Sequence, residues 1–322
     1  MRAIVHDRYG SADVLHLAEI ERPSVGDDDV LLRVKAASLH IGDWHLMAGL
    51  PLMVRPAVGW RAPKTRVRGL DVAGLVEAVG ANVSRFRPGD EVFGVCDGSL
   101  AECAVARADT LEAKPAALSF EQAAAVPTSA VTALQAVAPV RAAGPGERVL
   151  IIGASGAVGG YAVQLAKTFG AQVTGVASAA KLDYVLSLGA DAAVDYERGD
   201  ITRSGERYDL VLDTAGNRSV SSLRKLLARR GTLVIVGGEG GGRVTGGFER
   251  ALRALLLSPF VPQTLTGLVS TMRRDDLHTI AGLLESGAIR PVIDRVYPLA
   301  ESAAAMRRLT DGSIRGKVVI TP

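Results

Sequence analysis

Three glycines are the residues of this chain whose type and spacing point most directly to a binding chemistry. Gly153, Gly156 and Gly159 follow the apolar run Val149–Ile152, which is typical of a buried parallel strand. Apolar residues then recur at helical intervals over 158–169, so the glycines stand between a strand and a helix. Phosphate groups bind to the N–H groups at a helix N-terminus, and side chains in the turn would hold them away. The spacing therefore predicts a pyrophosphate site of the dinucleotide-binding type.

The residues after the next strand, Val173–Ala177, indicate which dinucleotide binds. An Asp or Glu at that position usually accepts hydrogen bonds from the ribose 2′-hydroxyl. Here Ser178 and Lys181 follow the strand, and no carboxylate does. A hydroxyl and an ammonium suit a 2′-phosphate, so we expect NADP(H); the alternative is that Lys181 is a solvated lysine of the next helix. Tyr196, after the following strand, either contacts the adenine or the 2′-phosphate or is an ordinary core or surface tyrosine.

Other residues expected at the dinucleotide lie beside the glycine turn or at the ends of two later strands. These strands are predicted over Leu210–Asp213 and Thr232–Val236, and the glycines after them would let a nicotinamide ring lie flat against the backbone. Besides the residues named above, the expected cofactor-binding residues are Ser155, Ala157, Val158, Asp213, Thr214, Val236, Gly237 and Gly238.

Two histidines and an aspartate, His40, Asp43 and His45, lie close together in the first part of the chain. Delivery of hydride from a nicotinamide leaves negative charge on the acceptor, and a hydrogen-bond donor must stabilise that charge. Histidine titrates near neutral pH, so His45 or His40 is a candidate to polarise a carbonyl group or to donate a proton. The alternative for each is a structural histidine that binds the backbone. Asp43 is included among the catalytic candidates, chiefly as the residue that orients this loop.

The elements that must position these residues change character along the chain. The first part is β-rich, with strands predicted over Asp71–Val79 and Glu91–Val95. From residue 121 onward, strands alternate with helices, which are predicted over Lys181–Leu188 and Val220–Arg230. This alternation predicts an α/β fold in which a doubly wound parallel sheet follows a β-rich domain.

Composition excludes several classes of protein. The chain has 322 residues, 48% hydrophobic and 22% charged, so two domains with substantial cores are expected. The net charge is +3, and no basic tract with interleaved aromatics is present, so we expect no nucleic-acid partner. Cys96 and Cys103 have no adjacent Lys or Arg, and we expect buried, unreactive thiols. Glycine, proline and polar residues break the uncharged stretches, so we expect no membrane span. The N-terminus lacks a signal-peptide pattern, so we expect a cytoplasmic protein.

Several motifs together resemble one family over essentially the whole chain. They are Gly42-Asp43-Trp44-His45, Gly69-Leu70-Asp71-Val72-Ala73-Gly74, Arg87-Pro88-Gly89-Asp90-Glu91-Val92, Ala123-Ala124-Ala125-Val126-Pro127, the glycine turn and Gly316-Lys317-Val318-Val319. The chain resembles the medium-chain dehydrogenase/reductase superfamily, in its zinc-free, quinone-oxidoreductase-like branch.

This resemblance implies a split architecture. Residues 1–122 and 271–322 would form a GroES-like catalytic domain, and residues 123–270 a Rossmann NADP(H)-binding domain. The active site would lie in the cleft between them, and homodimers would pair through an edge strand near Gln263–Ser270. By analogy with the family, Thr132 would reach the nicotinamide ribose or a phosphate.

The resemblance also bears on the chemistry. Zinc-dependent relatives carry Gly-His-Glu where this chain has Gly69-Leu70-Asp71, so the histidine ligand of a catalytic zinc is absent. A zinc site can be drawn from His40, His45 and Cys96, but we expect no metal. Without zinc, acceptors that take hydride into a conjugated system are favoured, because they need less polarisation than an isolated ketone.

The expected function is therefore transfer of hydride from NADPH to a quinone or an α,β-unsaturated carbonyl compound. Two alternatives stay open: a biosynthetic enoyl reductase, carbonyl reductase or alcohol dehydrogenase, and a non-catalytic NADPH-sensing protein. The loop His40-Ile41-Gly42-Asp43 departs from the Asn-Pro that quinone-reductase relatives usually carry before the aspartate. This departure keeps the sensor alternative open and argues against transferring any one relative's substrate.

Overall fold

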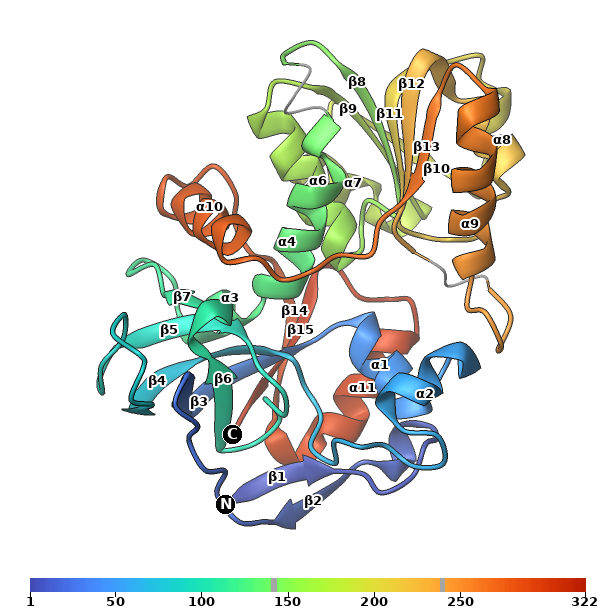
Figure 1. Cartoon of the computed structure of the whole chain (residues 1–322). Coiled ribbons are helices and arrows are strands. Elements are labelled where there is room, and N and C mark those ends of the chain that lie inside the picture. The colour runs from blue at the N-terminus through green and yellow to red at the C-terminus, as the bar shows by residue number, and fades with distance from the viewer. Residues whose placement is uncertain (140–143, 238–240) are drawn as a thin grey trace. The chain divides into compact units, whose positions relative to one another are not determined.

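The computed structural model describes residues 1–139, 144–237 and 241–322, and these form two compact units (Figure 1). Unit 1 comprises Met1–Val131 and Met272–Pro322, and unit 2 comprises Thr132–Thr271. The first division falls inside helix α4 (Pro127–Ala136), later in the chain than the predicted boundary at residue 122. The first turn of α4 belongs to unit 1 because the Thr128 N–H donates to Asp71 Oδ1 over 3.0 Å.

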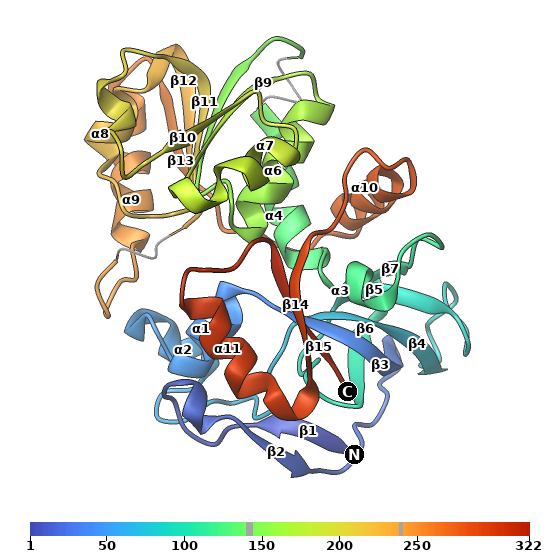
Figure 2. The same ribbon diagram turned by 180° about the vertical axis from the view of Figure 1, so that it is seen from behind.

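Unit 2 is built around a parallel sheet whose described strands have the order β10-β9-β8-β11-β12-β13. The strands are β8 (Arg148–Ile152), β9 (Gln172–Ala177), β10 (Ala192–Asp195), β11 (Tyr208–Asp213), β12 (Leu227–Ile235) and β13 (Thr264–Gly267). The helices are α6 (Ala157–Thr168), α7 (Leu182–Ser187), α8 (Val220–Arg224) and α9 (Phe248–Leu257). Figures 1 and 2 show α6 and α7 on one face of this sheet and α8 and α9 on the other. This is the doubly wound arrangement that the alternation predicts.

Buried aliphatic side chains hold this sheet between its helices. β8 is apolar and buried from Val149 to Ile152, because a central parallel strand is covered on both faces. Leu150, Leu223 and Leu265 belong to one buried cluster that joins β8, α8 and β13. The order of the strands reverses between β8 and β11, and ligands of such sheets bind outside the C-terminal ends of the strands at this point.

One predicted element of unit 2 is wrong. The helix predicted over Val220–Arg230 ends at Arg224, and strand β12 begins at Leu227. Leu227 is buried and pairs with Tyr208 of β11, so its place in the sheet outweighs the helical pattern. The pair Arg229-Arg230 is an exposed part of β12.

Unit 1 contains a sheet with the order β14-β15-β3-β4-β5-β7, to which β6 is added beside β3, and a hairpin of β1 and β2. Its strands are β1 (Arg2–Val5), β2 (His16–Glu19), β3 (Asp29–Leu39), β4 (Asp71–Val79), β5 (Glu91–Val95), β6 (Cys103–Arg107), β7 (Leu111–Ala113), β14 (Ile293–Pro298) and β15 (Lys317–Thr321). Its helices, besides the start of α4, are α1 (Ile41–Ala48), α2 (Arg55–Val58), α3 (Phe120–Ala124), α10 (Arg274–Glu285) and α11 (Ser302–Thr310). β4 and β5 have the predicted bounds.

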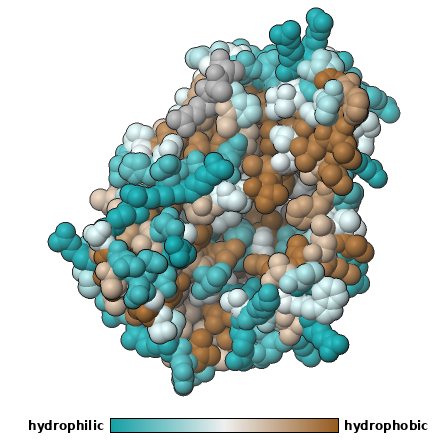
Figure 3. All heavy atoms as spheres, in the orientation of Figure 1, coloured by the Kyte–Doolittle hydropathy of each residue, from teal (hydrophilic) through white to brown (hydrophobic). Residues whose placement is uncertain are grey.

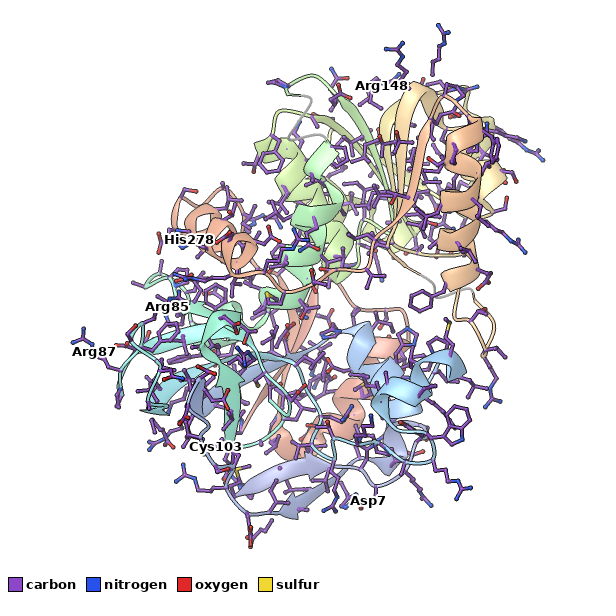
Figure 4. All side chains as sticks on the ribbon, viewed as in Figure 1. Asp7, Arg85, Arg87, Cys103, Arg148 and His278 are labelled. Carbon is purple, nitrogen blue, oxygen red and sulfur yellow. The ribbon has the colours of Figure 1, made fainter. Side chains whose placement is uncertain are left out.

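The C-terminal segment completes unit 1. β15 pairs antiparallel with β3 and parallel with β14. Helix α10 is tied to the first segment through Glu112, whose Oε2 lies 3.4 Å from His278 Nδ1 and 3.2 Å from Arg85 Nη2 (Figure 4). Both termini lie in this unit (Figure 2). The split domain that the resemblance implies is therefore present.

A buried ion pair also joins the two segments of unit 1. Lys317 Nζ on β15 lies 2.9 Å from Asp71 Oδ2 on β4, and both side chains are at most 1% exposed. Ser38 Oγ donates to the same Asp71 oxygen over 3.0 Å. Burial raises the pKa of Asp71, but the Lys317 charge, the nearby His40 and hydrogen bonds from Thr128 and Lys317 outweigh burial and hold the pKa below its ordinary value. The carboxylate is therefore ionised at neutral pH.

Candidate functional site

The three glycines of the predicted pyrophosphate site occupy the turn between β8 and α6, and they serve different purposes. Gly153 has φ +85°, and a Cβ there would lie 2.4 Å from Thr214 Oγ1. At Gly159 a Cβ would lie 2.1 Å from the Gly153 carbonyl oxygen, so this glycine lets α6 pack against the turn. Gly156 has φ −77°, and the nearest atom to a Cβ there is the Gly153 oxygen at 3.4 Å. The fold requires glycine at 153 and 159 but leaves space at 156.

The space at Gly156 lies at the N-terminus of α6. Gly156 is the N-cap of this helix, and no side-chain hydrogen bond caps it. The N–H groups of Ala157 and Val158 in the first turn have no acceptor within the helix, and the helix dipole favours an anion there. Ser155 is buried beside them. This arrangement has the chemistry of a phosphate-binding helix end.

Ser178 and Lys181 follow the end of β9, and Tyr196 follows the end of β10. The Tyr196 N–H donates to the Ala177 carbonyl oxygen over 3.2 Å, which brings the two strand ends together. The Tyr196 side chain is 48% exposed and lines a polar pocket of about 570 Å³. The pocket also includes Arg198, Asn217, Arg218 and Ser219. No carboxylate occurs over 178–182.

Two predicted cofactor residues at the end of β11 have internal partners. The Asp213 carboxylate is fully buried, accepts from the Gly216 N–H over 3.1 Å and pairs with Arg250 of α9. Thr214 Oγ1 donates to the Ile152 carbonyl oxygen over 2.8 Å. These side chains therefore support the strand end, and contact between either of them and a cofactor stays a prediction.

The chain after β12 is held close to β11. The N–H groups of Val236 and Gly237 both donate to the Asp213 carbonyl oxygen. A Cβ at Gly237 would lie 2.1 Å from the Thr214 carbonyl oxygen, a separation that only glycine permits. Gly238, which was also predicted to bind the cofactor, lies outside the described residues.

Sequence reasoning did not identify Arg250, although its side chain reaches this edge of the sheet. The signal that could have revealed it is a cation in the first turn of a helix, where the helix dipole disfavours positive charge. Thr132, predicted by analogy, is a buried residue of α4.

His40 and Asp43 form a capping box at the start of α1 in unit 1. His40 is the N-cap residue, and its Nδ1 accepts from the Gly42 N–H over 3.0 Å. Asp43 Oδ2 accepts from the His40 N–H over 3.0 Å and lies 3.5 Å from His40 Nε2. Burial raises the pKa of the Asp43 carboxyl, whose Oδ1 is buried without a hydrogen bond to the described residues. Both residues thus hold the start of α1, and their contact with an acceptor stays a prediction.

His45 lies in the last turn of α1 and is partly exposed. Its ring makes an edge contact with Trp44, with 5.0 Å between ring centroids. Burial lowers the pKa of His45, a backbone hydrogen bond to Leu50 opposes this, and the nearby His40 lowers it further. The imidazole is therefore neutral at pH 7, so it can donate a hydrogen bond through N–H but carries no charge.

A cavity of about 190 Å³ lies beside α1 within unit 1. Its walls are partly apolar and partly charged, and they include Leu46, Val58, Leu70, Asp43 and Arg68. The Arg68 side chain is buried and donates from Nη2 to the Thr65 carbonyl oxygen. Burial lowers the pKa of Arg68, and Asp43 and Asp97 oppose that shift. Apolar walls with a few convergent polar groups are typical of small-molecule sites.

No group of three His, Cys, Asp or Glu side chains that could hold a metal ion is found within residues 1–139, 144–237 and 241–322. By the family resemblance, Leu70 takes the position of the zinc-ligand histidine of zinc-dependent relatives. Cys96 and Cys103 are free and buried, and burial raises the pKa of the Cys96 thiol. Independence from zinc stays a prediction that metal analysis tests.

Two family models match the chain. The model described as alcohol dehydrogenase GroES-like domain matches residues 26–136. The model described as zinc-binding dehydrogenase matches residues 188–320. The matches cover parts of both units, as the split architecture requires.

Several relatives are similar to this chain over its whole length. A chloroplastic quinone-oxidoreductase homolog of Spinacia oleracea is 33% identical, over 100% of this chain and 98% of its own. A chloroplastic NADPH-dependent alkenal/one oxidoreductase of Arabidopsis thaliana is 32% identical, over 100% of this chain and 80% of its own. The crystal structure of Escherichia coli quinone oxidoreductase complexed with NADPH has a TM-score of 0.85 and 25% identity, and covers 100% of both chains.

No helix among the described residues is long and apolar enough to cross a membrane. The expected cytoplasmic location stays a prediction, which fractionation of cells that express the chain would test.

Proposed function

The chain belongs to the medium-chain dehydrogenase/reductase superfamily, in its quinone-oxidoreductase-like branch, and we propose that it transfers hydride from NADPH to a quinone or an α,β-unsaturated carbonyl compound. The observation that carries this proposal is the N-terminus of α6. It is a helix end without a side-chain cap, with open space at Gly156, at the switch point of a doubly wound sheet. A pyrophosphate fits this combination because backbone N–H groups and the helix dipole both favour its charge.

A preference for NADPH over NADH is supported by the residues after β9 and β10. No carboxylate follows β9 to accept hydrogen bonds from a ribose 2′-hydroxyl, and Ser178 and Lys181 stand there instead. Tyr196 lines a pocket that includes Arg198 and Arg218, together with the acidic residues Glu197 and Asp200. A 2′-phosphate carries charge and strong acceptor oxygens, which the basic and hydroxyl groups among these can bind.

A quinone or enone acceptor is supported by the side chains around α1. Leu70 leaves no histidine to place a zinc ion at this position, so hydrogen-bond donors must stabilise the developing negative charge. His45 is neutral and partly exposed, and we propose that its N–H is such a donor. The cavity beside α1, which Leu46 and Val58 line and His45 does not, offers apolar walls to a small acceptor.

We further propose that the chain forms a homodimer through the β13 edge of unit 2. β13 is the last described strand of its sheet, so one side of it offers unpaired backbone groups. Exposed apolar side chains continue from α9 past its end, including Leu252 at 58%, Leu256 at 65% and Phe260 at 84% exposure. Figure 3 shows hydrophobic surface gathered over this helix. Light scattering of the wild type and of Leu256→Glu tests this, and a monomeric wild type contradicts it.

An NADPH oxidation assay tests the proposed reaction. Purified protein is mixed with NADPH or NADH and with a benzoquinone, a 2-alkenal, an alkenone or a saturated aldehyde. We expect oxidation of NADPH by the quinone or the conjugated carbonyl compounds, unchanged after treatment with EDTA. Binding of NADPH without turnover on any acceptor would favour the sensor alternative. Reduction confined to the saturated aldehyde, or stoichiometric zinc whose removal abolishes activity, would contradict the proposal.

A further inference from the structure

Arg250 binds three chain segments at the C-terminal edge of the unit 2 sheet. Its guanidinium pairs with the Asp213 carboxylate at the end of β11. Its Nη1 donates to the Gly237 carbonyl oxygen after β12 over 3.3 Å, and its Nε donates to the Arg218 carbonyl oxygen before α8 over 2.9 Å. The Arg250 side chain is 11% exposed and the Asp213 side chain is fully buried. One guanidinium therefore joins two strand ends and the start of a helix.

Local rules do not favour an arginine at this place. Arg250 lies in the first turn of α9, which begins at Phe248, and the helix dipole there disfavours a cation. A nearly buried guanidinium also needs a counter-charge, which Asp213 supplies from a distant part of the sequence. A local conflict that a long-range partner resolves is typical of positions that serve a function.

Arg250 makes its contacts at strand ends that belong to one half of the dinucleotide-binding sheet. A doubly wound sheet of this order consists of two mononucleotide-binding halves, which meet between β8 and β11. The glycine turn after β8 and the residues after β9 belong to the half that takes the pyrophosphate and the adenosine. The ends of β11 and β12, to which Arg250 binds, belong to the other half. In sheets of this kind, the backbone at Gly237 and around Asp213 would therefore belong to the half that takes the nicotinamide nucleotide.

We propose that Arg250 is a positioning residue for the nicotinamide end of the cofactor, an inference that rests on the proposed function. Arg250 does not touch the reacting atoms. It acts through the Gly237 carbonyl group and the turn after β11, which set where the nicotinamide lies. Hydride transfer needs the donor and acceptor carbons about 3–3.5 Å apart, so a small displacement of this backbone slows transfer more than it weakens binding.

An ion pair with only a structural role predicts a different result. Loss of such an ion pair would lower the unfolding temperature and would lower the affinity of unit 2 for every ligand to the same degree. A positioning role predicts a loss confined to ligands that carry the nicotinamide. The ligand 2′-phospho-ADP-ribose separates the two roles, because it has the adenosine and the pyrophosphate of NADPH but lacks the nicotinamide.

Three variants separate an effect on the cofactor from a general loss of folding: two at Arg250 that avoid an unpaired buried charge, and one control. Arg250→Lys keeps a positive charge for Asp213 but loses the planar set of donors. The double variant Arg250→Met with Asp213→Asn leaves no unpaired buried charge, and the asparagine oxygen can still accept from the Gly216 N–H. Arg253→Met is the matched control, because Arg253 is an exposed residue of the same helix.

Each variant is titrated with NADPH and with 2′-phospho-ADP-ribose, and single-turnover hydride transfer is measured to an acceptor that the wild type reduces. For both Arg250 variants we expect unchanged affinity for 2′-phospho-ADP-ribose and about tenfold weaker NADPH binding, the effect of one misplaced hydrogen-bonded group. Hydride transfer should slow by about a hundredfold, and Arg253→Met should match the wild type throughout.

Two outcomes would overturn the inference. One is an equal loss of affinity for NADPH and for 2′-phospho-ADP-ribose, and the other is hydride transfer at the wild-type rate in folded Arg250 variants. A wild-type protein that binds neither ligand would instead refute the proposed function, and the inference with it. The two failures are therefore distinguishable.

Discussion

A valine in place of Gly156 would project from the N-terminus of α6 into the space where we place the pyrophosphate. The backbone at Gly156 has φ −77° and ψ 172°, an extended conformation that valine adopts readily. The nearest protein atom to the new Cβ is 3.4 Å away, an ordinary contact. Glycine is preferred to valine at a helix N-cap, so the free energy of unfolding of the cofactor-free protein should fall by no more than about 1 kcal/mol.

The same side chain would displace the phosphate from the first N–H groups of α6. A hydrogen bond to a charged group contributes about 1.5–3 kcal/mol. Loss of the bonds from Ala157 and Val158 should then weaken NADPH binding by about 10²- to 10⁴-fold. NADPH fluorescence titration measures this loss, and thermal unfolding of the cofactor-free variant measures its stability.

Gly159→Ala is the matched control, and it should show the opposite pattern. Its Cβ would lie 2.1 Å from the Gly153 carbonyl oxygen, so α6 and the turn must move apart. Overpacking of this kind costs about 1–3 kcal/mol, and each kcal/mol lowers the unfolding temperature by about 2–4 °C in a domain of this size. A folded Gly156→Val variant with wild-type NADPH affinity would refute the reasoning, because the pyrophosphate would then lie elsewhere.

Substitutions at three other positions test the remaining assignments. His45→Ala should lower kcat/KM for an enone by about 10²- to 10³-fold without changing NADPH affinity, and His45→Tyr should restore part of it; near wild-type turnover would leave His45 a structural role. Because burial lowers the pKa of His45 below its ordinary value of 6.5, the midpoint of any change in kcat/KM that depends on His45 should lie below pH 6.5, and the change should disappear in His45→Ala. Lys181→Ala should weaken NADPH binding by about 5- to 150-fold and leave NADH unaffected, whereas equal affinity of the wild type for both cofactors would contradict the assignment. Lys317→Met leaves Asp71 buried without its counter-charge and should cost about 3–5 kcal/mol in thermal unfolding, with partial rescue in Lys317→Arg. The pKa of Asp71 is lower in the folded state, so the stabilisation by the Lys317–Asp71 ion pair is present above pH 3.8 and is lost as the pH falls through the folded-state pKa. A stability difference between Lys317→Met and the wild type that does not depend on pH would contradict this assignment.

The elements of unit 2 were largely predictable from local patterns. β8, β9 and β11 each extend the prediction by one or two residues. Buried parallel strands are continuous apolar runs, and the helices between them keep one apolar face, so both patterns survive in the sequence. The helix predicted over Val220–Arg230 was wrong because its second half pairs with β11, and no local period encodes that pairing.

The candidate site was predictable in position but not in the use of each side chain. The glycine turn, Ser178 and Tyr196 follow strand ends, and a strand end is recognisable from the residues around it. Asp213 was placed correctly at a strand end, but its carboxylate is bound to Arg250 of a later helix. The capping box of His40 and Asp43 was not predicted, because histidine is not among the residues that usually mark an N-cap.

The sequence by itself therefore determined which residues follow which strand and where a glycine turn lies, because turn chemistry and side-chain periodicity are local properties of the chain. Only the tertiary structure decided that a Cβ would lie 3.4 Å from the Gly153 carbonyl oxygen at Gly156 but 2.1 Å from it at Gly159, although the two glycines occur in one motif. It also decided which buried charges meet. Lys317 and Asp71 come from opposite ends of the chain, and a buried charge finds its partner through the packing of the whole unit rather than through any pattern along the backbone.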